Sequence, residues 1–315
     1  TQLQLWGYDT EDGHGPRVIL DRVTNYNRPI ITPRGDRVVF NDFPAKRVRI
    51  VNWDGSGLRD LTDGIATDVW ADPATGAEWV YTVAHEVEWY RGGPIGRFRL
   101  DDPTVREVVW DRSIVTWDNV QLSADGTRLS GQFPHPEAGF ATVPNGSVSA
   151  LGKGCWTSIA PDNSYLVWLF DGPHRNLQLH TADGRAWTTN VNGAPGMGGY
   201  EVYHPRWSNH VRYFTMTGPY QVGKMGDNLI GAGGPGVEIY LGRFAADFTA
   251  VEQWLRLTED SQGDFFPDLW IEGGELATSG LSGAAAPVGS VPAGDQAPTE
   301  AAPATAAAGR VRLEV

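Results

Sequence analysis

The chain has 315 residues, a formal net charge of −13 and an isoelectric point near 4.9. An acidic chain without a basic stripe is poorly suited to nucleic acid, because phosphate binding depends on clustered lysine and arginine. A single cysteine, Cys155, excludes an internal disulfide, and no apolar run approaches the roughly 18 residues that a membrane helix needs. The 39 glycines and 21 prolines interrupt the chain too often for long helices.

The predicted strands begin with two runs, residues 3–8 and 17–23, joined by a polar turn. The next stretch, residues 28–42, reads as a strand, a Thr-Pro-Arg-Gly turn and a returning strand. Asp and Gly recur in such turns, because Asp bonds the turn backbone and Gly accepts a positive φ. The same strand–turn–strand pattern returns in five further copies, at residues 68–85, 119–135, 156–172, 204–218 and 266–280.

A second predicted hairpin accompanies each of the first five copies. These hairpins lie at residues 48–64, 98–111, 140–151, 176–190 and 239–260. Two hairpins per unit, with units mostly about 40–50 residues apart, are typical of a β-propeller, in which each blade is a four-stranded sheet. No segment sustains the apolar period of a helix. The sequence therefore predicts an all-β propeller.

Several copies also share residue identities. Residues 257–260 (LTED), 264–267 (DFFP) and Trp270 resemble the repeat of TolB-like and tricorn-like propellers, in which a Leu-Thr pair precedes an Asp-x-x-Pro-x-Trp motif. Parts of this motif also occur at residues 61–64 (LTDG) and 204–209 (HPRWSN). The resemblance implies a six-bladed propeller, with seven blades as the alternative.

We expect the propeller to span residues 1–280, with the copy at 266–280 and the N-terminal strand pair closing the last blade. Residues 281–309 shift to Ala, Pro, Gly and Ser without aromatic residues. This composition predicts a disordered or extended linker, because it buries too little apolar surface to fold. Residues 310–315 are strand-like again and predict either the start of a further strand or domain or an edge strand that docks back on the propeller. The linker would join the propeller to a further C-terminal domain or assembly.

The geometry of a propeller predicts where ligands bind. The start of each inner strand and the loop between the second and third strands share one face, at the mouth of the central channel. The ligand-binding residues predicted at these positions are Arg28, Asp68, His85, Asp118, Asn119, Gln132, Trp156, Asp171 and Tyr203. The candidate catalytic residues on the same face are His135, His174, His204 and Arg175.

Histidines from several blades on one face suit two chemistries. Neutral imidazoles with a carboxylate or Gln can hold a divalent metal, and His135, His174 and His204 are the predicted ligands. A His or Tyr can instead abstract a proton next to a carboxylate whose charge an Arg neutralises. The architecture and residue types are similar to those of oligogalacturonate lyases, propeller enzymes with a metal bound by His and Gln.

Structural explanations compete with these assignments. Asp68, Asp118 and Asp171 suit loop capping, Trp156 suits packing between blades, and Cys155 beside a Trp suits a buried filler better than a nucleophile. Sequence motifs of the commonest haem proteins, zinc proteases and hydrolases are absent. Two hypotheses follow. The first is an exported (periplasmic or extracellular) binding or scaffold module for a protein or carbohydrate; the second is a carbohydrate-active enzyme, a metal-assisted lyase on uronic-acid polymers.

Overall fold

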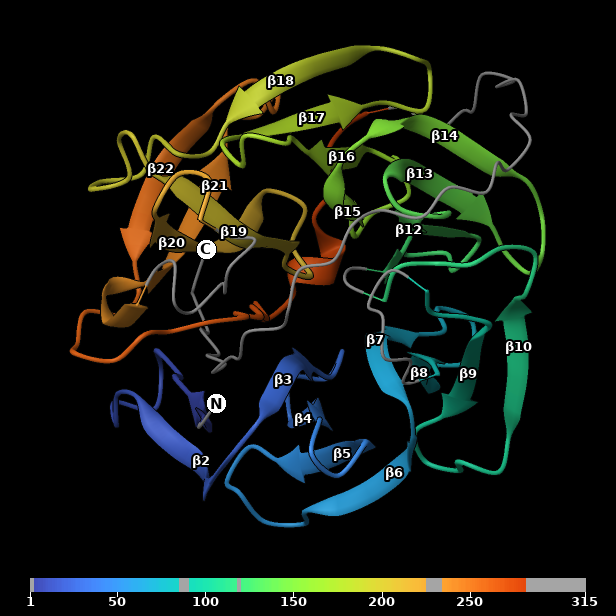
Figure 1. Cartoon of the computed structure of the whole chain (residues 1–315). Coiled ribbons are helices and arrows are strands. Elements are labelled where there is room, and N and C mark those ends of the chain that lie inside the picture. The colour runs from blue at the N-terminus through green and yellow to red at the C-terminus, as the bar shows by residue number, and fades with distance from the viewer. Residues whose placement is uncertain (1–2, 85–90, 118–119, 225–233, 282–315) are drawn as a thin grey trace.

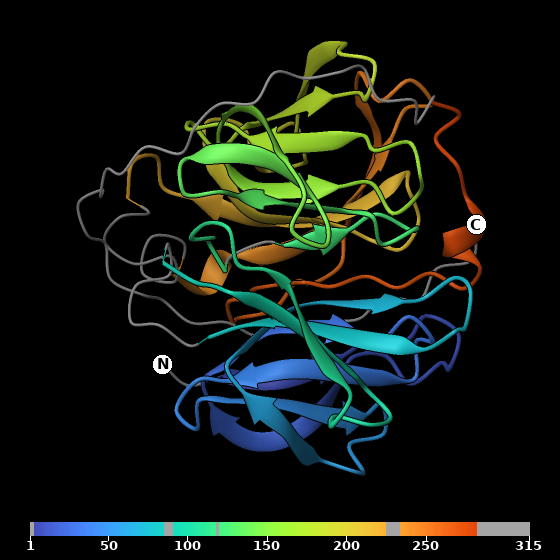
Figure 2. The same cartoon turned by 90° about the vertical axis from the view of Figure 1, so that its right-hand side faces the viewer.

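The computed structural model describes residues 3–84, 91–117, 120–224 and 234–281. They form five four-stranded antiparallel sheets and one two-stranded sheet around a central axis (Figure 1), and Figure 2 shows the same ring from the side. The only helices among these residues are the 3₁₀ turns η1 (Gly234–Gly236) and η2 (Gly274–Leu276). Within the described ranges no helix is long and apolar enough to cross a membrane.

Each blade is a meander whose strands follow one another in chain order. Blade 1 contains β3 (Tyr26–Ile31), β4 (Arg37–Asp42), β5 (Arg47–Asn52) and β6 (Arg59–Asp63). Blade 2 contains β7 (Ile65–Ala71), β8 (Glu78–Val83), β9 (Ile95–Arg99) and β10 (Arg106–Trp110). Blade 3 contains β11 (Gln121–Leu122), β12 (Arg128–Gln132), β13 (Glu137–Thr142) and β14 (Val148–Lys153). Blade 4 contains β15 (Cys155–Ile159), β16 (Val167–Phe170), β17 (Asn176–His180) and β18 (Ala186–Asn190). Blade 5 contains β19 (Glu201–Trp207), β20 (Tyr213–Tyr220), β21 (Glu238–Phe244) and β22 (Val251–Arg256), and β1 (Leu3–Gly7) pairs with β2 (Arg17–Thr24).

The predicted hairpins of blades 1 to 5 are confirmed, but the count of six or seven blades is wrong. Among the described residues five blades are four-stranded, and the copy at residues 266–280 forms no strand. Its backbone bonds to a side chain of blade 5 instead: Ile271 donates to Asn209 Oδ1 and accepts from Asn209 Nδ2, both at 2.8 Å. Gly273, at φ 67°, then leads into η2, so no returning strand follows.

Blade 2 shows how adjacent blades are joined. Asp68 Oδ2 accepts a hydrogen bond of 2.8 Å from the backbone N–H of Leu122 in blade 3. Two residues later, Trp70 Nε1 donates to the carbonyl of Ala124 at 3.0 Å. The Trp70 ring covers Gly126, at φ 68°, where a Cβ atom would lie 2.4 Å from the ring. The turn glycine is thus required by both its dihedral angle and the indole packed on it.

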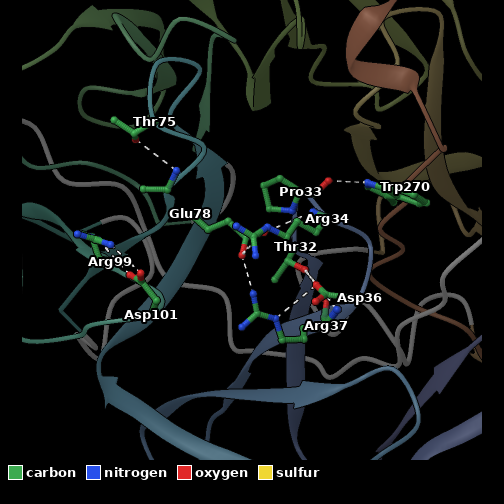
Figure 3. A network of polar contacts seen from close by, with 11 residues as sticks. Thr32, Pro33, Arg34, Asp36, Arg37, Thr75, Glu78, Arg99, Asp101 and Trp270 are labelled. Atoms are coloured by element: carbon green, nitrogen blue, oxygen red, sulfur yellow. Dashed lines mark hydrogen bonds and ion pairs between the residues drawn. The ribbon is translucent and has the colours of Figure 1, made fainter.

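The segment 264–271 repeats this joint at the closure of the ring. Asp268 Oδ2 accepts from the Ile31 backbone N–H at 2.7 Å. Figure 3 shows the second contact, in which Trp270 Nε1 donates to the Pro33 carbonyl at 2.9 Å. The Trp270 ring covers Gly35, where a Cβ atom would lie 2.7 Å from the ring. The segment therefore occupies the position of an inner strand between blades 5 and 1, although it is not paired with any strand.

Aromatic side chains fill the space between blades 4 and 5. Trp168 of β16 stacks on Trp207 of β19, with ring centroids 4.1 Å apart. Phe214 and Phe244 stack beside them with centroids 4.6 Å apart. All four side chains are at most 1% exposed. Packing between sheets therefore accounts for some of the 13 tryptophans of the chain.

Asp264, the first residue of this closing segment, has a buried side-chain Oδ2 with no hydrogen-bond partner among the described residues. Burial raises the pKa of Asp264 to about 6. The folded protein therefore holds this proton more tightly than the unfolded chain, and its stability falls as pH rises from about 4 to about 6. We expect Asp264→Asn to stabilise the protein by about 2–3 kcal/mol at pH 7.5 and by much less at pH 4. Urea denaturation of both proteins at the two pH values measures this, and an equal effect at both would contradict it.

Candidate functional site

Three inner strands are interrupted at the same point near the axis. The pairing register shifts between Asn27 and Ile30 in β3, between Cys155 and Ser158 in β15, and between Tyr203 and Arg206 in β19. Each interruption contains a non-glycine residue with a left-handed backbone. These residues, together with the equivalent one in the closing segment, are Arg28 (φ 45°), Trp156 (φ 42°), His204 (φ 55°) and Phe266 (φ 51°).

A left-handed backbone is unfavourable for bulky residues and persists where surrounding structure enforces it, often at binding sites. Here Arg28, Trp156, His204 and Phe266 all line one cavity at the axis, together with Thr67 and other residues. The cavity has a volume of about 30 Å³, which is room for about two water molecules. It can thus admit one substituent of a larger ligand.

His204 is 3% exposed and neutral. Its Nδ1 lies 2.8 Å from Thr217 Oγ1, and that hydroxyl donates to the Tyr203 carbonyl at 3.1 Å. With its one proton on the Tyr203 carbonyl, Thr217 Oγ1 accepts from His204 Nδ1–H and from the Tyr220 hydroxyl at 3.0 Å, and His204 then carries a lone pair on Nε2. Burial, with a smaller effect of Arg28, holds the pKa of His204 well below its usual value. Nε2 is buried and has no hydrogen-bond partner among the described residues, a state that costs about 1–3 kcal/mol unless a ligand satisfies it.

Arg28 places a positive charge beside this histidine. One guanidinium nitrogen donates to the Trp117 carbonyl at 3.1 Å. The guanidinium carbon lies 4.6 Å from the centre of the Trp117 ring and 5.4 Å from that of Phe266. Two aromatic rings thus fix the cation at the cavity. A fixed guanidinium next to a neutral imidazole acceptor suits a ligand that carries both a carboxylate and a hydrogen-bond donor.

An ion cluster lies at the same cavity. Arg206 of β19 reaches Asp68 of β7, across the axis (Figure 1), at 3.0 Å, and Asp268 at 2.8 Å. Burial raises the pKa of Asp68 to about 6 and raises that of Asp268, and Arg206 opposes both shifts. Because Asp68 also joins blades 2 and 3, its contacts are those of a structural residue. The predicted role of Asp68 in ligand binding stays a prediction.

A second polar cluster lies at the mouth of blade 4. Cys155 Sγ is 3.4 Å from His174 Nε2, and His174 Nδ1 is 2.8 Å from the Tyr203 hydroxyl. That hydroxyl donates to Glu201 Oε2 at 2.7 Å. A carboxylate only accepts, so Tyr203 donates to Glu201 and accepts from His174 Nδ1–H. The Nε2 lone pair of His174 therefore faces the thiol.

The surroundings of His174 shift its pKa in opposite directions. Its side chain is buried, and burial lowers its pKa, while the carboxylates of Glu201 and Asp171 oppose this shift. Burial and the Glu201 contact raise the pKa of Tyr203, which stays protonated. His174 itself has a left-handed backbone, with φ 54°. The sequence did not indicate that a base reaches Cys155.

The other predicted residues are placed as follows. Asp171 Oδ1 accepts from the backbone N–H groups of Arg175 and Asn176 at 2.8 and 3.1 Å, as a loop cap does. Gln132 lies against His135, with Nε2 2.9 Å from Nδ1. These residues are not among those that line the cavity. His85, Asp118 and Asn119 lie outside the described residues.

A metal site is not visible in the described part of the chain. It contains no group of three His, Cys, Asp or Glu side chains that could hold a metal ion. His174 and His204 each use Nδ1 for a hydroxyl partner, and His174 Nε2 faces Cys155. The binding of a divalent metal by His135, His174 and His204 thus stays a prediction.

Comparison with known proteins gives matches among solved structures. No protein-family model and no curated protein matches the chain. TolB from Acinetobacter baumannii aligns with a TM-score of 0.54 and 14% identity, over 80% of this chain and 59% of the TolB chain. A gluconolactonase from Xanthomonas campestris aligns with a TM-score of 0.45 and 14% identity, over 65% of this chain and 72% of its own. An oligogalacturonate lyase in complex with manganese aligns with a TM-score of 0.43 and 16% identity, over 77% of this chain and 69% of its own.

The TolB match shows that this chain has the TolB-like β-propeller fold, as the sequence repeat implied. The chain spans 59% of the length of that TolB chain. At 14% identity the likeness concerns the fold alone, because one fold hosts many functions. The class of protein is thus a TolB-like propeller, and the residues that distinguish this chain lie in the cavity and the blade 4 cluster.

Proposed function

We propose that this propeller is a binding module that takes a group of a protein or carbohydrate into the cavity at the channel mouth. The observation that carries this proposal is the convergence of four left-handed, non-glycine residues on one cavity. A left-handed backbone is costly for bulky residues and is often retained at binding sites, so its repetition around one cavity supports ligand binding there. The TolB-like fold is compatible with a binding role.

The cavity chemistry suggests which group enters. Arg28 suits a carboxylate, and His204 Nε2 suits a neighbouring hydroxyl or amide donor. The limited space excludes a whole sugar ring but accepts the carboxylate of a uronic acid or of an acidic side chain. Trp156 and Phe266 would shield the ion pair from water and so strengthen it.

Calorimetric titration tests this proposal, with digalacturonate as the carbohydrate probe and a short Asp/Glu-rich peptide as the protein probe. We expect one of them to bind at one site, and Arg28→Gln to weaken that binding about tenfold or more, since a charged hydrogen bond contributes about 1.5–3 kcal/mol. His204→Phe should also weaken it. Arg185→Gln, at an exposed ion pair with Asp183, is the matched control. Equal affinity of Arg28→Gln and Arg185→Gln would refute the site.

A second candidate is a lyase on uronic-acid polymers. Its support is that His204, a neutral base, and Arg28, which would neutralise the substrate carboxylate, line the same cavity. Metal analysis of the purified protein and an assay for unsaturated products from polygalacturonate test it. A metal-free protein that is inert toward this polymer removes the lyase. If the wild-type protein cleaves the polymer and His204→Gln does not, the protein is a lyase and the proposal of a binding module is wrong.

We further propose that the module is exported and tethered through the Ala/Pro-rich stretch 281–309, with a further domain or assembly beginning near 310–315. Residues 282–315 lie outside the described ranges, and the composition of the stretch supports the proposal. Fractionation of the native cells, followed by immunodetection, tests the export. Recovery of the protein with the cytoplasm alone would contradict it.

A further inference from the structure

We propose that Cys155 and His174 form a nucleophilic thiol–imidazole pair that accepts an activated acyl group, as in an ester or thioester. This activity goes beyond ligand binding in the cavity. Cys155 is partly exposed, whereas His174 is buried and held by Tyr203 and Glu201. A thiol, a base within hydrogen-bond reach and a group that orients the base are the three parts of a nucleophilic site.

The contacts around His174 support proton transfer from the thiol. Sγ lies 3.4 Å from Nε2, the nitrogen that carries the lone pair. The groups that face the imidazole are the Cys155 thiol, the Tyr203 hydroxyl and the carboxylates of Glu201 and Asp171. Both carboxylates would stabilise the imidazolium that forms. Glu201 is itself fixed, because its Oε1 accepts from the Gly223 backbone N–H at 3.1 Å.

The pair also lies next to the place where a ligand would sit. Trp156 follows Cys155 directly and lines the cavity, and its ring centroid is 6.3 Å from that of His174 and 5.6 Å from that of His204. The buried and unsatisfied Nε2 of His204 is an independent indication of a ligand at this wall. A ligand anchored there would bring its neighbouring atoms toward blade 4.

The reaction balances without a further reagent. The thiol proton passes to His174 Nε2, and Sγ attacks the acyl carbon of an ester, so that an S–C bond forms and the C–O bond to the leaving alkoxide breaks; with a thioester the acyl C–S bond breaks and a thiolate leaves in the same way. The imidazolium then returns the proton to the alkoxide, which leaves as an alcohol. The product is an S-acyl cysteine, which water can hydrolyse with His174 again as the base.

Because Cys155 is the only cysteine, alkylation by iodoacetamide reports on this thiol alone. We expect the native protein at pH 7 to react about tenfold faster than the urea-denatured chain, and its rate to reach half-maximum at a lower pH. His174→Gln should abolish this difference. Tyr203→Phe should move the half-maximum toward that of the denatured chain, since Tyr203 is a positioning residue. His180→Gln, in the same blade, is the control and should leave the rate unchanged.

Acyl transfer is tested with p-nitrophenyl acetate. We expect a burst of about one nitrophenolate per chain and an acetyl group on the Cys155 peptide in mass spectrometry, with neither in Cys155→Ser. Circular dichroism must show that each variant is folded, and His174→Asn serves as a second base-free variant. The proposal is overturned if native and denatured protein share one pH profile that is indifferent to His174, or if acetyl is absent from Cys155. Neither result depends on Arg28, so the binding proposal is tested separately.

Discussion

Replacing Arg206 by alanine is expected to destabilise the propeller by about 3–5 kcal/mol at pH 7.5, because it leaves buried charge without a partner. The guanidinium contacts Asp68 at 3.0 Å and Asp268 at 2.8 Å, and their side chains are only 11% and 9% exposed. These two residues also accept backbone N–H groups of the following blades. The loss therefore affects two inter-blade joints at once. Urea denaturation gives the free energy of unfolding.

The control is Arg185→Ala, which removes an exposed pair with Asp183 and should cost about 1 kcal/mol or less. The triple variant Arg206→Met, Asp68→Asn, Asp268→Asn should be more stable than Arg206→Met alone. In the triple variant no buried charge is left without a partner. An Arg206→Ala variant as stable as Arg185→Ala would show that the cluster contributes little to the closure of the ring.

Trp168→Ala is expected to cost about 3–5 kcal/mol, the usual effect of removing a large aromatic side chain from a core. Trp168 is fully buried and stacks on Trp207 with centroids 4.1 Å apart. Its Nε1 also donates to the Trp156 carbonyl at 2.8 Å. This bond holds the strained residue that forms a wall of the cavity, so the variant should also weaken ligand binding.

Trp168→Phe separates the two effects, because it keeps most of the ring packing and loses the hydrogen bond. We expect a smaller loss of stability, about 1–2 kcal/mol, with weakened binding retained. Trp6→Ala, at a 40% exposed indole, is the control and should have a small effect. Full stability of Trp168→Ala would contradict the assignment of this pair to the core between blades 4 and 5.

The hairpins of five blades were predictable because strand, turn and strand leave a local signature: alternating apolar residues around Asp and Gly. The sixth copy has the apolar residues and a Gly-Gly turn, but the predicted hairpin does not form, because its backbone bonds to Asn209, a residue distant in sequence. What remained of the repeat was its Asp268 and Trp270, which join blades as Asp68 and Trp70 do. The Asp and Trp of the motif thus indicate the contact between adjacent blades, and they do not require that the segment forms a strand.

The candidate site was predictable where it depends on position in the repeat. Arg28, Trp156 and His204 were expected near the channel mouth, and all three line the cavity. The link from Cys155 to Glu201 was not predictable, because it joins side chains from separate blades through a left-handed His174. No spacing in the sequence encodes such a contact. Tautomers and charge states follow only from the partners that the fold brings together.

The most direct test of the binding proposal is a crystal structure of the protein with digalacturonate or with the acidic peptide, whichever binds. We expect a carboxylate on the Arg28 guanidinium and a ligand donor on His204 Nε2, with the ligand between Trp156 and Phe266. A ligand bound elsewhere, with the cavity at the channel mouth holding solvent alone, would contradict the account.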